Sequence, residues 1–337
     1  MNHTVLPVPD LENRFLEPEG WRWHTFKHKD RTLRFGSVFP KDEIPSAVVV
    51  CLPGLSEFCE KYFETARTCL NLNLAFWVLD WAGQGASSRF LDDPQKRHST
   101  GFADDVADLH YFVDSYVKPA SVHPDRGRIP RVMLAQSMGG HIGLHYLHAH
   151  PEVFTCAAFC APMFGIKALA HIPDGIAQKA TAFMNTYFGT HYVCGASTWD
   201  PPRMRPTRGP RRLSTDPVRN GVHTAWFESR PALQTGFVTY GWVREAYLSC
   251  KALENPDFLK TIQTPCLIAQ AGKDHLVDNQ KIDHVARILT HADYRIFPES
   301  HHEILMEKEN IRQEFFTHFQ TLIRKNILER PETLKPF

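Results

Sequence analysis

Ser137 lies in the stretch "RVMLAQSMGGHIGL", residues 131–144, between an apolar run and a helix-like run. Gly139 stands two positions after the serine, as in the G-x-S-x-G turn that carries a nucleophilic serine, but Ala135 stands where the first glycine belongs. Small residues are needed there because strand and helix pass closely. Alanine adds one methyl group, so the pattern is weakened but not broken. The residues alone leave two interpretations open: a catalytic nucleophile, or an ordinary serine in a tight turn.

A histidine and an acid that could activate this serine follow it along the chain. A serine hydroxyl needs a histidine to take its proton and a carboxylate to orient that histidine. Asp274 comes soon after the apolar run "TPCLIAQAG", and His302 ends the stretch "YRIFPESHH". Asp278 is the rival acid and His301 the rival base. The alternative roles are a helix-capping carboxylate for Asp274 and an exposed loop histidine for His302.

The elements that would position these residues follow from hydrophobic patterning. Apolar runs alternate with helical patterns, which predicts a mostly parallel sheet covered by helices on both faces. Core strands are expected at "SAVVVCLPG", "LAFWVLD", "RVMLAQ", "FTCAAFCAP", "TPCLIAQAG" and "DYRIFPES". The earlier stretches "WRWHTFKH" and "RTLRFGSV" alternate more and predict an antiparallel edge. Ligands of open α/β sheets bind beyond the carboxyl ends of the strands, so Ser137, Asp274 and His302 are expected at one edge.

Residues 163–256 interrupt this alternation. They contain the segment "DPPRMRPTRGPRR", scattered aromatic residues and no convincing core strand. We therefore expect an inserted, largely helical cap over the carboxyl edge of the sheet. Residues 1–162 and 257–337 would form the core domain.

Composition excludes several classes of function. The formal net charge of +1 gives no electrostatic reason to expect a nucleic-acid partner. No apolar run approaches the roughly 20 residues of a membrane span, and residues 1–15 lack the pattern of a signal peptide. The eight cysteines include no C-x-x-C pair, which favours a reducing, cytoplasmic setting. His141 and His145 are spaced i, i+4 but lack the H-E-x-x-H glutamate, so packing is preferred and no metal or cofactor is expected.

Together these pieces resemble the α/β-hydrolases of the bacterial lysophospholipase and monoacylglycerol lipase group, also called serine aminopeptidase S33-like. The resemblance runs over nearly all of the chain and rests on "PGLSEFCEKYFE", "LDWAGQGASSR", "AQSMGGHIGLHYL", "AGKDHLVD" and "SHHEILMEKE". It implies the α/β-hydrolase fold and a catalytic triad of Ser137, Asp274 and His302. The family histidine precedes E-I-L-x-x-E, which selects His302 over His301. Besides the altered elbow, a proline replaces the family's histidine before Gly54.

Acyl transfer also needs hydrogen-bond donors for the oxyanion. By analogy with this fold, Met138 would offer its backbone N–H directly after the nucleophile. Leu55, in the loop "LPGLSEF" after the first core strand, would offer the second N–H.

The cap is expected to select the substrate. Aromatic candidates for an acyl-chain pocket are Trp199, Trp226, Tyr240 and Trp242, although most cap aromatic residues are expected only to hold the cap to the sheet. Residues 203–212 carry five arginines and no acid. Arginine suits phosphate recognition, so Arg205 and Arg208 are candidates for binding a phosphate headgroup or an anionic membrane surface. A solvated lid loop is the alternative.

The sequence thus predicts a serine esterase that cleaves a small-molecule or lipid-like monoacyl ester, a lysophospholipid or a monoacylglycerol, through an acyl-enzyme. It is expected in the cytoplasm, with association at the inner membrane as a further expectation. A peptidase or acyltransferase on the same triad and a non-catalytic ligand-binding member of the fold are the alternatives.

Overall fold

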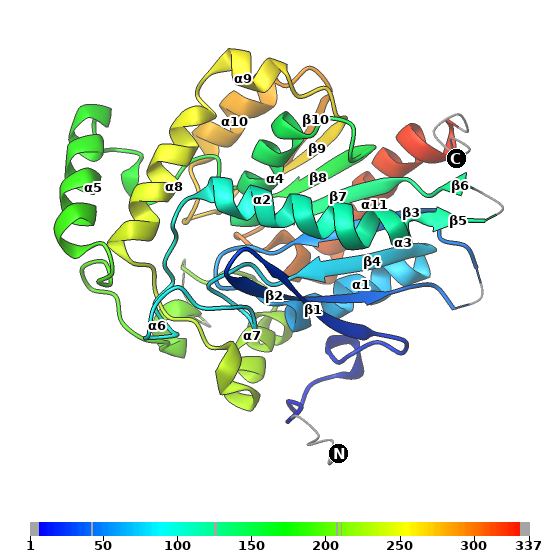
Figure 1. The fold of residues 1–337 in the computed structure, drawn as a ribbon, viewed down its shortest axis with the longest axis horizontal. Helices are drawn as coiled ribbons and strands as arrows, with labels where there is room; N and C mark the ends of the chain where they lie inside the picture. The colour runs from blue at the N-terminus through cyan, green and yellow to red at the C-terminus, as the bar shows by residue number, and fades with distance from the viewer. Residues whose placement is uncertain (1–6, 42, 125–126, 207, 210, 331–337) are drawn as a thin grey trace.

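A sheet of eight strands, parallel except at one edge, forms the centre of the described part of the chain (Figure 1). The computed structural model describes residues 7–330 except 42, 125–126, 207 and 210, so the first six residues of the N-terminal segment lie outside it. The strand order is β1-β2-β4-β3-β7-β8-β9-β10. The strands are β1 (Arg22–His28), β2 (Arg31–Val38), β3 (Ala47–Leu52), β4 (Leu74–Leu79), β7 (Arg131–Gln136), β8 (Cys156–Cys160), β9 (Cys266–Ala271) and β10 (Ala292–Phe297).

Each core strand expected from the sequence is confirmed, and so is the antiparallel edge formed by β1 and β2. In β3, Val48 and Val50 pack into one hydrophobic layer, whereas Val49 and Cys51 pack into the other. A strand that is apolar on both sides must be covered on both, which is why the run reads as continuous. The short pair β5 (Val122–His123) and β6 (Gly127–Arg128) was not expected, because two residues give no period to recognise.

Helices cover both faces of the sheet (Figure 1). One face is covered by α2 (Phe102–Phe112), α4 (Met138–Ala149) and α10 (Asn279–Ile288). The other is covered by α1 (Phe63–Asn71) and α11 (Glu309–Ile323). Shorter helical segments are η1 (Asn13–Phe15), η2 (Cys59–Tyr62), η3 (Val113–Val117), α3 (Lys118–Ala120), η6 (Ile304–Met306) and η7 (Arg324–Leu328). Within the described residues, none of the helices combines the length and apolar character needed to cross a membrane.

The chain between the paired strands β8 and β9 is largely helical. Its helices are η4 (Lys167–Leu169), α5 (Asp174–Phe188), α6 (Pro201–Met204), α7 (Pro217–Ser229), η5 (Pro231–Leu233), α8 (Tyr240–Ala252) and α9 (Pro256–Lys260). Helix α5 packs along α8 at one end of the molecule, away from the sheet (Figure 1).

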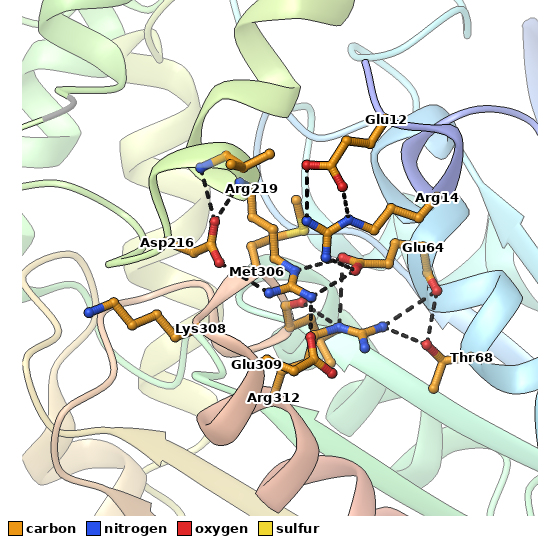
Figure 2. A network of polar contacts seen from close by, with 12 residues as sticks. Glu12, Arg14, Glu64, Thr68, Asp216, Arg219, Met306, Lys308, Glu309 and Arg312 are labelled. Carbon is orange, nitrogen blue, oxygen red and sulfur yellow. Dashed lines mark hydrogen bonds and ion pairs between the residues drawn. The ribbon is translucent and has the colours of Figure 1, made fainter.

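A buried ion-pair network attaches α7 to the core (Figure 2). The Arg219 guanidinium donates to both carboxylate oxygens of Glu64 on α1, each at 2.8 Å. It also pairs with Asp216 at the start of α7 and with Glu309 on α11. Arg14, near the N-terminus, reaches the same Glu64 at 3.2 Å. Since these partners come from distant parts of the sequence, the network fixes where the inserted segment sits on the core.

Candidate active site

Ser137 occupies a sharp turn between β7 and α4, with φ of 50° and ψ of −114°. A positive φ is strained for a residue with a side chain, and the sharp strand-to-helix turn of a nucleophile elbow imposes it. The turn is held at both backbone groups of the serine. Ser137 N–H donates to Cys160 O at 3.0 Å, and Met163 N–H donates to Ser137 O at 2.9 Å.

The residues two positions on either side of Ser137 differ in how much room they have. A Cβ on Gly139 would lie 2.1 Å from the carbonyl oxygen of Leu52, so only glycine fits there. Ala135 is fully buried in β7, where it pairs with Leu52 of β3 and Phe159 of β8. The sheet therefore accommodates the methyl group by which this chain departs from the G-x-S-x-G pattern.

His302 and Asp274 are hydrogen-bonded at the carboxyl edge of the sheet. His302 Nδ1 lies 2.6 Å from Asp274 Oδ2. The other oxygen of Asp274 accepts from the backbone N–H groups of Leu276 and Val277, at 2.8 and 3.1 Å. Gln136, which precedes the serine, donates to the carbonyl of His302 at 3.0 Å and so ties the two loops together.

The electrostatics of this pair favour a charged form of the histidine. Burial lowers the pKa of His302, but the nearby Asp274 carboxylate and its hydrogen bond outweigh burial and raise it above the ordinary value. Burial likewise works to raise the pKa of Asp274, and the same partner holds it below its usual range. An imidazolium that forms during a reaction would therefore be stabilised.

The rival acid and base have other roles. Asp278 is the N-cap of α10 and accepts from Gln280 N–H at 3.0 Å. His301 donates its backbone N–H to Glu307 at 2.8 Å, and burial lowers the pKa of its ring. Neither is among the described residues that line the cavity at Ser137.

Ser137 and His302 line one cavity of about 260 Å³. Its remaining described walls are mostly apolar, and the polar side chains among them are Ser56, Glu57, Arg205, His223 and Glu303. The lining comprises Gly54, Leu55, Ser56, Glu57, Ser137, Met163, Ile166, Met204, Arg205, Leu213, His223, Gly236, Phe237, Val238, Trp242, Leu276, Val277, His302 and Glu303.

The two proposed oxyanion donors are a residue of the cavity lining and the residue directly after the serine. Leu55 lines the cavity, and Met138 is the first residue of α4, where a helix has no internal partner for its N–H groups. The backbone of Gly54, the residue before Leu55, lies close to the serine: a Cβ on Gly54 would be 3.2 Å from Ser137 Cβ.

Gln84, whose role the sequence analysis missed, holds the loop that carries Leu55. Its buried carboxamide donates to Gly54 O at 2.8 Å and Glu57 O at 2.7 Å, and accepts from Ser56 N–H at 3.1 Å. Hydrogen bonds thus fix the residues on either side of Leu55. The only sequence signal is the position of Gln84 in "GQG" shortly after β4.

Of the four aromatic residues expected in an acyl pocket, the structure places only Trp242 among the described lining residues. Trp226 packs against Phe63 of the core with ring centroids 5.8 Å apart, and Trp199 packs against Phe227 at 5.6 Å. The Tyr240 hydroxyl accepts from the backbone N–H of Cys194 at 3.0 Å. These three hold the inserted segment in shape, as was expected for most of the aromatic residues in this segment.

The sequence analysis placed Arg205 in a basic run that would meet a phosphate or a membrane, or else be solvated. Neither expectation holds for Arg205. This side chain is only 7% exposed and forms a bidentate pair with Glu303, at 2.9 and 3.1 Å. It lines the cavity, but its charge is already matched by a carboxylate. Arg208 is exposed and is not among the described lining residues.

The paired helix histidines contact a serine. His141 and His145 place their Nε2 atoms 2.6 and 3.2 Å from the hydroxyl of Ser249 on α8. Within the described residues, no group of three or more His, Cys, Asp or Glu side chains is arranged to hold a metal ion.

Comparison with known proteins identifies the relatives of this chain. The family model of serine aminopeptidase, S33, matches residues 43–309. Lysophospholipase L2 of Escherichia coli (strain K12) is 32% identical over 277 residues, which cover 79% of this chain and 76% of the relative. A monoacylglycerol lipase of Mycolicibacterium smegmatis is 24% identical over 277 residues, covering 81% and 86%.

Solved structures agree on the fold. A soluble variant of monoglyceride lipase from Saccharomyces cerevisiae superimposes with a TM-score of 0.69 at 13% identity, covering 91% of this chain and 96% of that one. A carboxyl esterase from Bacillus coagulans gives 0.67 at 15% identity, covering 92% and 100%.

The sheet, the covering helices and the serine turn define an α/β-hydrolase. Within that class, the chain belongs to the serine aminopeptidase S33 family, and it is a carboxylic ester hydrolase.

Proposed function

We propose that this hydrolase cleaves the ester of a monoacyl lipid, a monoacylglycerol or a lysophospholipid, through an acyl-enzyme on Ser137. One observation carries the proposal: Ser137 and His302 line a cavity whose walls are mainly apolar, as an acyl chain requires. The names of the relatives, lysophospholipase and monoacylglycerol lipase, support the same class of substrate.

The reaction would follow from the positions of three side chains. Ser137 Oγ attacks the ester carbonyl while His302 takes its proton, and Asp274 stabilises the imidazolium through the bond at 2.6 Å. The oxyanion accepts from the N–H groups of Leu55 and Met138, each worth about 3 kcal/mol in the transition state. His302 then gives its proton to the leaving alcohol. A water molecule, deprotonated by His302, finally releases the fatty acid and restores Ser137.

We further propose that residues 163–256 act as a cap that supplies the substrate-selecting wall. Met163, Met204, Phe237 and Trp242 come from this segment and line the cavity. A peptide substrate would need partners for its backbone N–H and C=O groups, and these walls offer few. The apolar lining therefore favours an acyl chain over a peptide.

Peripheral contact with a lipid surface is assigned to helix α5 instead of the arginine run. Ile176, Phe183 and Tyr187 are 60%, 58% and 64% exposed, and their spacing of seven and four residues places them on one face. An amphipathic helix with such a face binds at the interface of a bilayer. The exposed Lys179 on the same helix suits anionic lipid. The eight free cysteines fit the reducing cytoplasm, where this surface would meet the inner membrane.

Replacing Ile176, Phe183 and Tyr187 together with serine should abolish co-sedimentation with phosphatidylglycerol-containing vesicles. Hydrolysis of vesicle-borne substrate should fall. Hydrolysis of a monomeric short-chain ester should stay within about twofold of the wild-type rate, because α5 contains none of the proposed catalytic residues. The matched control replaces three exposed apolar residues elsewhere, Val122, Ile296 and Leu328, with serine. Equal vesicle binding by both triple variants would contradict the assignment.

The proposed function is tested by measuring fatty acid release from 1-decanoylglycerol, decanoyl lysophospholipids and methyl decanoate. An aminoacyl amide and a glycerol acceptor are included to detect peptidase and acyltransferase activity. We expect hydrolysis of the lipid esters to exceed amide cleavage by several orders of magnitude. Amide cleavage without ester hydrolysis would favour the peptidase. Acyl transfer to glycerol in preference to water would favour the acyltransferase, and inactivity on every substrate a binding protein.

A further inference from the structure

One side of the cavity is polar and deeply buried. Glu57 comes from the loop after β3, Arg205 and His223 come from the inserted segment, and Glu303 follows the histidine His302. Each of these four residues is at most 7% exposed. In the proposed mechanism His302 protonates the oxygen of the leaving alcohol. Because Glu303 is the next residue after His302, we place the leaving alcohol on this polar side of the cavity.

The charges on this side cancel one another. Lys61, directly behind the cavity wall, contacts Glu57 and lies 2.7 Å from Glu303. Arg205 forms its bidentate pair with the same Glu303, at 2.9 and 3.1 Å. Burial works to raise the pKa of Glu303, but the Arg205 and Lys61 cations outweigh it and hold the carboxyl well below its usual range. Two cations thus face two carboxylates, and no positive charge is left over for a phosphate.

His223 is a polar group on this side whose Nδ1 atom lacks a hydrogen-bond partner among the described residues. Its ring packs against Phe58 at 4.9 Å and Phe227 at 4.2 Å between centroids, and is 2% exposed as a residue. Its Nδ1 atom is buried without a hydrogen-bond partner among the described residues. Burial, with the Arg205 and Lys61 charges, pushes the pKa of His223 well below the ordinary value. The imidazole is therefore neutral, with one donor and one acceptor.

A neutral imidazole and a set of paired charges match a particular chemistry. A hydroxyl group both donates and accepts, so it can satisfy His223 in either tautomer. A phosphate only accepts and carries charge, so it would have to displace Glu303 from Arg205 and leave a carboxylate buried without its partner. Buried polar groups in native proteins are nearly always satisfied, and His223 also lines the cavity, so a bound hydroxyl is a suitable partner for its ring.

We propose that this side of the cavity binds an uncharged, hydroxyl-bearing leaving alcohol such as glycerol, that His223 hydrogen-bonds one of its hydroxyls, and that phosphate-bearing headgroups are disfavoured. This inference rests on the proposed function and narrows its substrates to esters of the monoacylglycerol kind.

The first test replaces His223 with phenylalanine, which keeps a ring against Phe58 and Phe227 but removes both nitrogens. We expect the ratio of kcat/KM for 1-decanoylglycerol to that for methyl decanoate to fall about five- to tenfold, as for one lost hydrogen bond. His301→Phe is the matched control, because His301 is also buried but is not among the described lining residues. An unchanged ratio in His223→Phe, or an equal fall in the control, would overturn the role of His223.

The second test concerns charge. The wild type should cleave 1-decanoylglycerol at least tenfold more efficiently than its phosphate-bearing counterpart, decanoyl lysophosphatidic acid. Glu303→Gln removes one carboxylate charge and should raise the ratio of phosphate-bearing to neutral substrate severalfold, whatever it does to the absolute rates. Glu299→Gln is the control, because Glu299 lies in the same loop but is exposed and pairs with Lys273.

A wild type that prefers the phosphate-bearing substrate, or a Glu303→Gln variant with an unchanged ratio, would overturn the inference. Methyl decanoate separates this failure from failure of the proposed function. A wild type that hydrolyses the methyl ester without preferring the glycerol ester would contradict only the inference. A wild type inactive on every ester would contradict both.

Discussion

Ser137→Ala is expected to abolish ester hydrolysis and labelling by a fluorophosphonate while leaving the protein folded. The change removes the single oxygen that would attack the ester, and loss of such a nucleophile lowers kcat by about 10⁶-fold in a serine hydrolase. The turn itself is held by backbone hydrogen bonds to Cys160 and from Met163, which alanine keeps. Rate, label and thermal unfolding are measured on the same preparation. Retained hydrolysis in a folded Ser137→Ala protein would rule out Ser137 as the nucleophile.

The second large effect is expected for His302→Ala, with a loss in kcat of about 10⁴-fold or more. His302 Nδ1 is engaged by Asp274, which leaves Nε2 for the serine proton. The matched variant His301→Ala should stay within about tenfold of wild type, because His301 is not among the described residues that line the cavity. The rates are compared by steady-state kinetics on methyl decanoate.

A double variant distinguishes a catalytic unit from two independent defects. Ser137→Ala/His302→Ala should be little slower than either single variant, since residues that act as a unit are not additive. Similar losses in His301→Ala and His302→Ala would leave the base unassigned and contradict the account.

The sheet and the serine turn could be predicted from sequence because local patterns determine them. Continuous apolar runs such as Ala47–Leu52 identify strands buried on both faces. The carboxyl ends of parallel strands meet at one edge, so sequence order alone places Ser137 near the loops of Asp274 and His302. The family motif after His302 selected the histidine that the structure finds bonded to Asp274.

The inserted segment, residues 163–256, could not be predicted at the same depth, because contacts with residues distant in sequence determine where its side chains lie. Arg205 meets Glu303 across 98 residues of sequence, and a run of arginines gives no sign of a buried partner. The same holds for Trp226, whose neighbour Phe63 lies on α1. Aromatic composition therefore predicts a pocket but not which residues line it. The structure shows that Trp226 packs in the core, whereas Trp242 lines the cavity.

Gln84 and His223 were missed for a related reason. Gln84 matters through hydrogen bonds to the backbone of another loop, which leave no trace in side-chain patterns. His223 stands in a helix sequence without any motif, and its significance depends on lacking a partner within a cavity. Both features become visible only when loops distant in sequence are brought together.

The most direct test of the account is the mass of the peptide that carries the acyl group. Trypsin cleavage after Arg131 and Lys167 releases residues 132–167, in which Ser137 is the only serine. After brief reaction with a p-nitrophenyl decanoate pulse and acid quench, mass spectrometry should find a decanoyl adduct on this peptide, located at Ser137 by fragmentation. The decanoyl adduct should be absent in Ser137→Ala, and pretreating the wild type with a fluorophosphonate should replace it with a phosphonyl adduct on the same residue. A modified residue other than Ser137, or rapid hydrolysis with no covalent adduct in any peptide, would contradict the acyl-enzyme mechanism.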